Sequence, residues 1–390
     1  MQGIGIQHDE DTGRHRMTSV PQFEFESRTR IVFGAGKIES LGELAGSLNI
    51  SRALVVSDPG IVRAGHTARG VAALEGQGIT CHLFEDVQEN PTTDHVEAGR
   101  RVAAEVRPDV IIGLGGGSSM DCAKGINFVH SCGGRMQDYW GVGKAEKPML
   151  PMIAVPTTAG TGSETQSFAL ISDADTHQKM ACGDKKAAFR IALLDSELTA
   201  TQPAMVTAVT GIDAISHALE TLVTTKRSPA SEMLSRQAWH LLGNAFQRVL
   251  EDASDLEARA NMQLGACLAG LAIENSMLGA AHALANPLTA TYGTVHGQAV
   301  GVMLPHVIRF NAAREESTYR SLGISSAETL ADRITQLVSV AGLETRLANL
   351  GVEESQFEAL ASQAAQQWTG RFNPRAVDQQ NLCELYQLAW

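Results

Sequence analysis

The chain has 390 residues, of which 44% are hydrophobic and 19% are charged, and its formal net charge is -12. Single hydrophobic cores stop growing near about 250 residues, so this length predicts two domains. The acidic balance argues against a nucleic-acid partner, because such proteins use clustered Lys and Arg to bind the phosphate backbone. Small molecules are the expected partners.

Six cysteines are scattered without a CxxC pair, which indicates neither a disulfide framework nor a thiolate zinc site. The sequence contains no apolar run near the roughly 18 residues of a membrane span, and its first residues lack a signal pattern. We therefore expect a protein of the reducing cytoplasm with no membrane partner. Residues 1–20 are polar and aperiodic, and we predict a flexible extension outside the fold.

Short apolar runs alternate with amphipathic segments from about residue 29 to residue 200. Strands are predicted at 30–34, 52–58, 109–117, 152–157 and 190–195, with helices between them, for example over 61–78 and 92–106. This alternation predicts a parallel sheet with helices on both faces. Helical periodicity then takes over, as at 229–250 and 255–283. The prediction is an α/β domain over 21–200, followed by an all-α domain over 201–390.

A glycine cluster, Gly115 to Gly117, follows the predicted strand 109–117 and opens a helix. Glycines let the backbone come close to a ligand, and a helix start offers free N–H groups to a phosphate. Asp121 would repel a phosphate, so it is expected to cap the helix or to bind ribose hydroxyls. The spacing does not match GxGxxG, and a tight structural turn is the alternative interpretation.

A second turn, residues 154–166, also follows an apolar run and is rich in small and hydroxyl residues. Both turns lie at the carboxyl ends of predicted parallel strands, where open α/β sheets bind ligands. Asp58 ends another of these strands. A carboxylate there suits the ribose hydroxyls of NAD and would repel the 2′-phosphate of NADP, although a simple turn residue is the more common role.

The second half contains an Asp and a His four residues apart, Asp213 and His217, within a helical pattern. This spacing places both side chains on one face of a helix, within reach of a common ion, although an exposed hydrogen-bonded pair is the alternative. His282 lies in an apolar segment, and His296 follows a Tyr-Gly turn. Together they offer one carboxylate and three imidazoles, a donor set that suits iron(II) or zinc.

Six segments resemble the iron-dependent (group III) alcohol dehydrogenase family. They are "GLGGGSSMDCAKG", "PTTAGTGSE", "TGIDAISHALE", "GAAHALANPL", "VHGQAVGVMLPHVIRFN" and "FNPRAV", in the family's order. The resemblance covers the chain from about residue 29 to its end. It implies a dehydroquinate-synthase-like fold, in which a dinucleotide-binding α/β domain precedes a helical metal-binding domain, with a cleft between them.

The resemblance also implies roles for individual residues. A metal ion would bind Asp213, His217, His282 and His296. Iron(II) is the expected metal, and zinc is the alternative. NAD(H) would contact Asp58, Asn90, Gly116, Gly117, Ser118, Asp121, Thr157, Thr158, Thr161, Lys179 and Leu198. Family members commonly dimerise, so a homodimer or a higher homo-oligomer is expected.

Asn286 departs from the family pattern. Many members carry a His at this position, proposed to relay the substrate's proton to solvent, and Asn has no group that titrates near neutral pH. We therefore place Asn286 in the catalytic set with an altered relay. Phe168, Ile273 and Leu278 are predicted to form an apolar substrate wall, with core packing as the alternative.

The sequence thus predicts an NAD(H)-linked, metal-dependent alcohol dehydrogenase or aldehyde reductase for short alcohols or aldehydes. One alternative is a metal-independent reductase of the maleylacetate reductase type, although all four ligand positions are retained. A lyase of the dehydroquinate synthase type is disfavoured by the motif order. A nucleotide-binding protein without activity is a further alternative, and Asn286 is the one feature that favours it.

Overall fold

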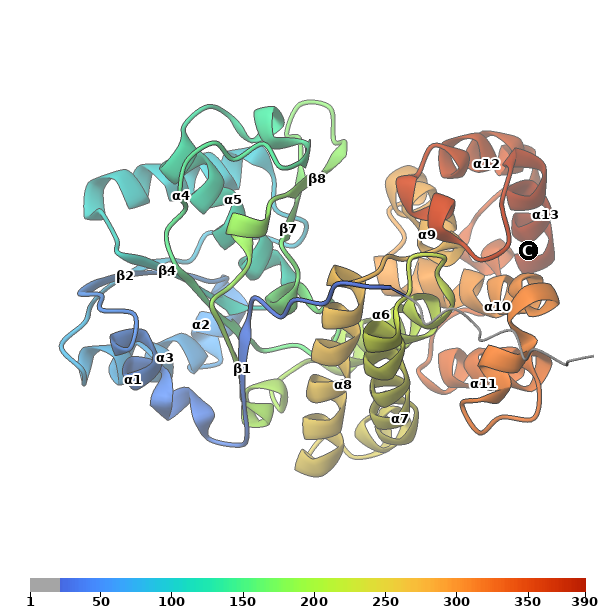
Figure 1. Ribbon diagram of the computed structural model, residues 1–390, viewed down its shortest axis with the longest axis horizontal. Coiled ribbons are helices and arrows are strands. Elements are labelled where there is room, and N and C mark those ends of the chain that lie inside the picture. Colours follow the sequence, from blue (N-terminus) through green and yellow to red (C-terminus); the bar gives the residue numbers. More distant parts are fainter. Residues whose placement is uncertain (1–21) are drawn as a thin grey trace, which may run out of the picture.

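The computed structural model describes residues 22–390. The predicted N-terminal extension, residues 1–20, lies outside this range. An α/β half and a helical half lie beside each other, with helix α8 next to the sheet half (Figure 1). Within the described range, no helix combines the length and the apolar character needed to cross a membrane.

A six-stranded parallel sheet organises the first half, in the order β1-β9-β6-β4-β2-β3. Its strands are β1 (Arg30–Phe33), β2 (Arg52–Val56), β3 (Thr80–Phe84), β4 (Val110–Gly115), β6 (Met152–Pro156) and β9 (Ile191–Leu194). The five strands predicted from apolar runs are confirmed. The edge strand β3 was not predicted, since only its last residue, Phe84, is buried and the segment lacks a long apolar run.

Helices cover both faces of this sheet. They are α1 (Leu41–Gly46), α2 (Pro59–Arg63), α3 (His66–Glu75), α4 (Thr93–Val106) and α5 (Gly117–Cys132). Alternate residues of β2 enter different cores, because Leu54 packs with α4 and α5 whereas Val55 packs with α1 and α3. The single helix predicted over 61–78 is wrong. Gly65 has φ 80°, a left-handed conformation that separates α2 from α3.

A second, three-stranded sheet projects from the α/β half. It contains β5 (Gly141–Val142), β7 (Phe168–Ser172) and β8 (Lys179–Gly183), and β7 and β8 form an antiparallel pair. This hairpin carries two of the predicted site residues, Phe168 and Lys179.

The second half is helical, as predicted. Its helices are α6 (Ala204–Val223), α7 (Pro229–Glu251), α8 (Leu256–Glu274), α9 (Ala280–Tyr292), α10 (His296–Arg320), α11 (Ala327–Val340), α12 (Phe357–Ala365) and α13 (Gln379–Ala389). The described chain also has 3-10 turns: η1 (Lys37–Ser40), η2 (Met136–Tyr139), η3 (Ser163–Thr165), η4 (Lys185–Ala187), η5 (Ser196–Thr199), η6 (Leu347–Leu350), η7 (Glu354–Gln356) and η8 (Trp368–Phe372).

The continuous helix predicted over 255–283 is wrong, because the chain leaves helical structure between α8 and α9. Asn275 ends α8, and its side chain donates to the Leu271 carbonyl over 2.9 Å. His282 therefore lies in the first turn of α9 rather than near the end of a long helix. The domain boundary expected near residue 200 stays a prediction, and this position lies in the connection between η5 and α6.

Candidate active site

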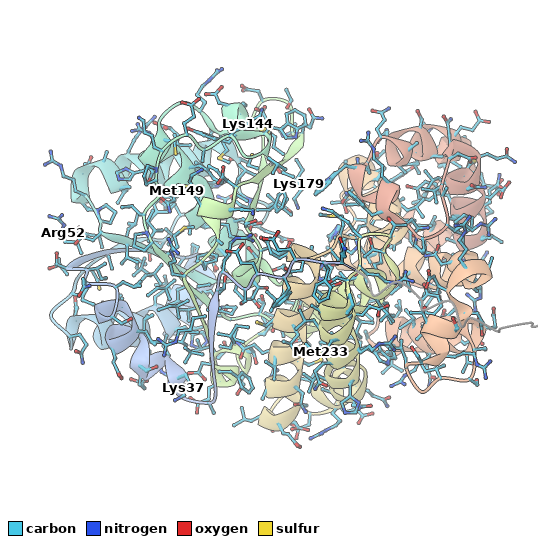
Figure 2. The ribbon with its side chains drawn as sticks, viewed as in Figure 1. Lys37, Arg52, Lys144, Met149, Lys179 and Met233 are labelled. Carbon is cyan, nitrogen blue, oxygen red and sulfur yellow. The ribbon has the colours of Figure 1, made fainter. Side chains whose placement is uncertain are left out.

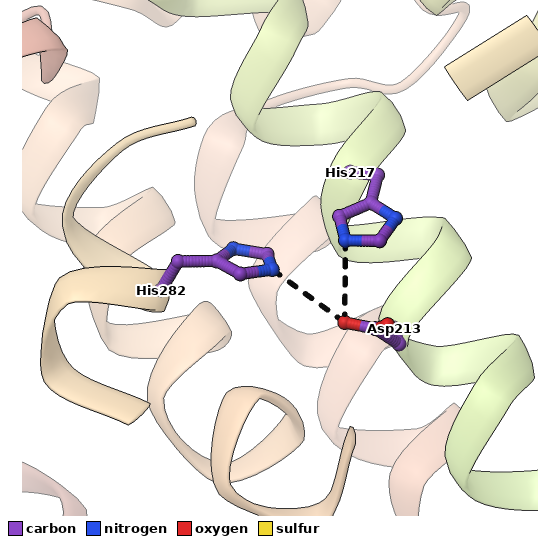
Figure 3. A group of neighbouring side chains, drawn as sticks. All are labelled: Asp213, His217 and His282. Carbon is purple, nitrogen blue, oxygen red and sulfur yellow. Dashed lines mark ion pairs between the residues drawn. The ribbon is translucent and has the colours of Figure 1, made fainter. Parts of the chain in front are cut away.

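Helix α6 presents Asp213 and His217 on one face, one turn apart. Both side chains are buried, so the alternative of an exposed hydrogen-bonded pair does not hold. His217 Nε2 lies 3.4 Å from Asp213 Oδ1. Figure 3 shows this imidazole and that of His282 directed at the same carboxylate oxygen.

Two further helices bring the remaining imidazoles to that oxygen. His282 Nε2, from the first turn of α9, lies 3.5 Å from Asp213 Oδ1. His296 Nε2, from the first residue of α10, lies 3.8 Å away, and about a third of its side chain is exposed (33%). The four side chains come from three helices and meet at one point.

This arrangement fits a divalent metal ion. Ligand atoms of Asp213, His217 and His282 all lie within 4.8 Å of one another. A tetrahedral ion with bonds of about 2.1 Å would hold its ligand atoms roughly 3.4 Å apart, close to the distances from Asp213 Oδ1. Asp213 Oδ1 and His282 Nε2 are also buried without a hydrogen-bond partner within residues 22–390. Unpaired buried polar atoms are costly, and an ion would satisfy both.

The electrostatics of the cluster agree with a cation-binding role. Burial acts to raise the pKa of Asp213, but the surrounding imidazoles, His217 first, outweigh it and hold this pKa well below its usual range. Burial lowers the pKa of His217 and favours its neutral form. His282 behaves differently. Burial acts to lower its pKa, but the neighbouring carboxylates of Asp213 and Glu220 outweigh burial and raise the pKa to about 9.

Glu220 is a functional candidate that the sequence prediction did not include. It is buried on α6, and its Oε2 lies 2.6 Å from His282 Nδ1. The spacing of Asp213, His217 and Glu220, i, i+4 and i+7 along one helix, is the sequence signal that could have found it.

The predicted cofactor loops lie side by side because β2, β4 and β6 are neighbours in the sheet. Contacts between the glycine cluster and the second turn are close: a Cβ added at Gly116 would lie 3.4 Å from Thr158 Cγ2, and one at Gly117 would lie 2.7 Å from Thr161 Cγ2. Only glycine fits at position 117 without moving Thr161. The backbone N–H groups at the start of α5 therefore lie beside a hydroxyl-rich loop, an arrangement that suits a pyrophosphate.

Three more predicted cofactor residues contact one another. The Asn90 N–H donates to Ser118 Oγ over 3.3 Å, and Lys179 Nζ donates to Asn90 Oδ1 over 3.3 Å. Asn90 has φ 53°, a left-handed conformation that Asn tolerates better than most residues. Figure 2 shows Lys179 on the side of the α/β half that faces the helices.

Asp58 lies two residues beyond β2 and serves as the N-cap of α2. Its Oδ1 accepts hydrogen bonds from the backbone N–H groups of Gly60 and Ile61, at 2.9 and 3.1 Å. Its Oδ2 accepts one from Ser119 over 3.3 Å, at the start of α5. The carboxylate therefore lies beside the glycine cluster, as a ribose-binding group would.

Asp121 does not cap α5, which corrects that part of the prediction. Its Oδ1 accepts a hydrogen bond of 2.6 Å from Ser163 Oγ and lies 3.6 Å from the ammonium group of Lys124. Lys124 is fully buried and also donates to the carbonyls of Ser163 and Phe168. The pair thus ties the first turns of α5 to the second loop.

The two remaining cofactor predictions differ in their surroundings. Thr157 Oγ1 is buried and has no hydrogen-bond partner in the described chain, so a ligand could use it. Leu198 is completely buried in the core beneath the sheet. Only its backbone remains for contact with a cofactor.

The metal cluster and the cofactor loops adjoin each other. The second loop packs against α6, since a Cβ added at Gly160 would lie 2.5 Å from the Cβ of Thr210, one turn before Asp213. Burial lowers the pKa of His296, and the positive charge of Lys179 contributes to this lowering.

Comparison with known proteins agrees with this geometry. The iron-containing alcohol dehydrogenase family model matches residues 28–196, and the C-terminal model of the same family matches residues 207–390. Alcohol dehydrogenase 4 of Schizosaccharomyces pombe is 36% identical over 93% of this chain and 88% of its own length. The NAD-dependent methanol dehydrogenase of Bacillus methanolicus is 31% identical over 92% of this chain and 97% of its own length. A crystal structure of 1,3-propanediol oxidoreductase superposes with a TM-score of 0.91 at 31% identity, covering 95% of this chain and all (100%) of that one.

The chain belongs to the iron-containing alcohol dehydrogenase family. The predicted family, fold and enzyme class, an alcohol dehydrogenase, are thereby confirmed. Members of this family use NAD(H) and iron. The family is named for iron and neither relative is named for zinc, so the alternative metal has no support here.

In this iron-containing alcohol dehydrogenase, Asn286 lies on α9 one turn after His282. Its Nδ2 donates to Gln367 Oε1 over 3.0 Å. The next residue, Trp368, packs against Phe168 from the α/β half, with ring centroids 5.9 Å apart. Asn286 and Phe168 thus contact the adjacent residues Gln367 and Trp368.

The other two predicted wall residues lie at the junction between α8 and α9. Ile273 is buried in the last turn of α8 and Leu278 is half-buried in the link that follows. Their roles as substrate contacts stay predictions.

Proposed function

We propose that this chain is an NAD(H)-linked, iron(II)-dependent dehydrogenase of short alcohols, or reductase of the matching aldehydes. The observation that carries the proposal is the convergence of three imidazoles on Asp213 Oδ1, next to two small-residue loops at the carboxyl edge of a parallel sheet. Such an edge is where α/β sheets bind dinucleotides.

The ion and the cofactor would supply the chemistry that side chains lack. When bound, the ion provides Lewis acidity toward the substrate oxygen, and the nicotinamide exchanges a hydride with the neighbouring carbon. The protein residues contribute placement. Asp213, His217, His282 and His296 would hold the ion, while the loops at Gly116 and Thr158 would hold the pyrophosphate within reach of it.

NAD(H) rather than NADP(H) is the proposed cofactor because of Asp58. Its carboxylate would accept hydrogen bonds from ribose hydroxyls, and its negative charge would repel a 2′-phosphate. Lys179 and Asn90, which are hydrogen-bonded to each other, would contact the cofactor on the side nearer to His296.

Asn286 is proposed to orient a water molecule or a hydroxyl group, without transferring a proton itself. Its amide donates to Gln367, which also has no group that titrates near neutral pH. The proton would therefore leave through water or through a hydroxyl of the cofactor ribose. We also propose that the rings of Phe168 and Trp368 form one wall of an apolar substrate site.

Two experiments test the proposal together. Anaerobically purified protein should contain iron, and it should oxidise NADH in the presence of short aldehydes. Treatment with a chelator should remove this activity, and added iron(II) should restore it. Activity that survives complete metal removal would favour a metal-independent reductase. No NADH consumption with any aldehyde and any added metal would favour a non-catalytic nucleotide-binding protein. The expected homodimer or higher homo-oligomer is tested by sedimentation of the same sample.

A further inference from the structure

Glu220 connects the metal cluster to the start of α9. It lies on α6, one turn beyond His217, and both of its carboxylate oxygens are used. Oε2 lies 2.6 Å from His282 Nδ1, and Oε1 accepts a hydrogen bond of 2.6 Å from the Ala281 backbone N–H. Its side chain is almost fully buried (4% exposed).

The first of these contacts fixes the state of the imidazole. A carboxylate accepts hydrogen bonds and cannot donate them, so His282 Nδ1 must carry the proton in this contact. Metal binding requires that the ring gives up its other proton, and the lone pair of the neutral ring then lies on Nε2, the atom that faces Asp213 Oδ1 at 3.5 Å. Metal-binding histidines typically have a partner of this kind on the second nitrogen, and the partner sets the tautomer and the ring orientation.

The second contact fixes the position of the backbone that carries His282. Helix α9 begins after Gly279, which has no capping side chain of its own. Its first N–H groups are satisfied from elsewhere: that of Ala280 donates to Asn373 Oδ1 over 3.3 Å, and that of Ala281 donates to Glu220. A Cβ at Gly279 would lie 3.0 Å from Glu220 Oε1, so the chain passes very close to this carboxylate.

We propose that Glu220 is a positioning residue for the metal site, which holds His282 in the tautomer that presents Nε2 to the ion and anchors the first turn of α9. This inference rests on the proposed function, because it assigns the role of Glu220 toward the proposed metal ligand His282. Glu220 itself contacts neither the substrate nor the cofactor in this proposal.

Glu220→Gln is an informative substitution because an amide cannot satisfy both partners. If its oxygen accepts from Ala281, its NH2 group faces His282 Nδ1 and favours the tautomer with the proton on Nε2, which blocks metal binding. If the amide is reversed, the tautomer is kept but two N–H groups face each other at Ala281. The size of the side chain is unchanged in both cases.

The test is an anaerobic competition for iron(II) between the protein and a chromophoric chelator, using Glu220→Gln, wild type and two comparison variants. Glu220→Gln is expected to lower the affinity for iron(II) about 10- to 100-fold, the usual range for such partners. Glu315→Gln is the matched control, since Glu315 is also a buried carboxylate but pairs with Arg227. It should bind iron(II) as wild type does.

The outcomes separate the two levels of the proposal. If Glu220→Gln is folded and binds iron(II) like wild type while His282→Ala loses binding, the role of Glu220 is wrong and the metal site stands. If His282→Ala also binds normally, the metal site itself is wrong. If Glu220 only stabilises the fold, Glu220→Gln would lower thermal stability and leave the affinity for iron(II) unchanged.

If Glu220→Gln does not fold, nitrogen NMR of wild-type histidines decides the question, with zinc added as a diamagnetic probe. A proton on Nδ1 of His282 supports the assignment, and a proton-free Nδ1 overturns it.

Discussion

Asn286 donates a hydrogen bond to Gln367 Oε1 over 3.0 Å, one helical turn beyond His282. Neither partner can take up or release a proton near neutral pH, so in the proposed function the substrate's proton would leave by another route. Replacing Asn286 with His introduces a group with an ordinary pKa of about 6.5 at this point. We expect the profile of kcat against pH to gain an inflection near that value.

Asn286→Gln is the control, because it changes the side chain without adding a titratable group. Its kcat should keep the pH profile of wild type. If Asn286→His is active and its profile is also identical to that of wild type, the position has no part in proton transfer.

Asp58 combines a structural role with the proposed cofactor selection, and two substitutions separate them. Asp58→Asn keeps an oxygen that can cap α2 but removes the charge that would repel a 2′-phosphate. We expect the ratio of kcat/KM for NADPH to that for NADH to rise about tenfold, which corresponds to about 1.4 kcal/mol. Thermal stability should remain close to that of wild type.

Asp58→Ala removes the cap as well, which should cost about 1 kcal/mol of unfolding free energy. It should also relax cofactor preference, so the two variants differ mainly in stability. An unchanged preference in both would show that Asp58 is only the N-cap seen in its bonds to Gly60 and Ile61.

Several parts of the site were predictable because local sequence dictates them. A fully buried parallel strand such as β4 reads as a continuous apolar run, and the glycines that follow it mark the sheet edge. The spacing of Asp213 and His217 places both on one helix face whatever the tertiary structure. Nothing local relates His282 and His296 to that face, so their place in the donor set was inferred from residue type and then from the family resemblance.

Other features depend on contacts between distant segments and left no local signal. Asp121 has the sequence position of a cap or a ribose ligand, yet Ser163 and Lys124 hold its carboxylate inside the protein. The break between α8 and α9 lies in a segment whose apolar residues continue the helical pattern. The spacing of Glu220 places it on the helix face of Asp213 and His217, but its contact with His282 depends on the position of α9.

The ring pair of Phe168 and Trp368 supports a prediction about substrate size. Trp368→Ala removes one ring from a contact that joins the α/β half to the helical half. We expect longer alcohols to fit better, because each additional buried methylene is worth about 0.8 kcal/mol. The ratio of kcat/KM for hexanol to that for ethanol should rise at least about tenfold.

Trp140→Ala is the comparison, because Trp140 is similarly exposed (45% against 38%) but follows η2 in the α/β half. It should not change the ratio. An unchanged ratio in Trp368→Ala as well would remove these rings from the proposed substrate wall.

The buried carboxyl group of Glu164 leads to a prediction of how the stability of the fold changes with pH. It is buried in η3, and burial raises its pKa from 4.5 to about 7, against smaller opposing effects of its backbone N–H and Lys124. The folded protein thus binds this proton more tightly than the unfolded chain does. The resulting stabilisation is complete below about pH 4.5, declines as the pH rises, and is lost above about pH 7, a change of about 3 kcal/mol.

Glu164→Gln stays neutral at every pH and should lack this decline. We expect the free energy of unfolding in urea to fall less between pH 5 and pH 8 in Glu164→Gln than in wild type, by about 2 to 3 kcal/mol. Glu105→Gln, at an exposed position on α4, is the control and should follow wild type. The difference between the curves of Glu164→Gln and wild type isolates this one carboxyl group from all other titrating groups. Parallel pH curves would therefore mean that Glu164 does not take up a proton on folding.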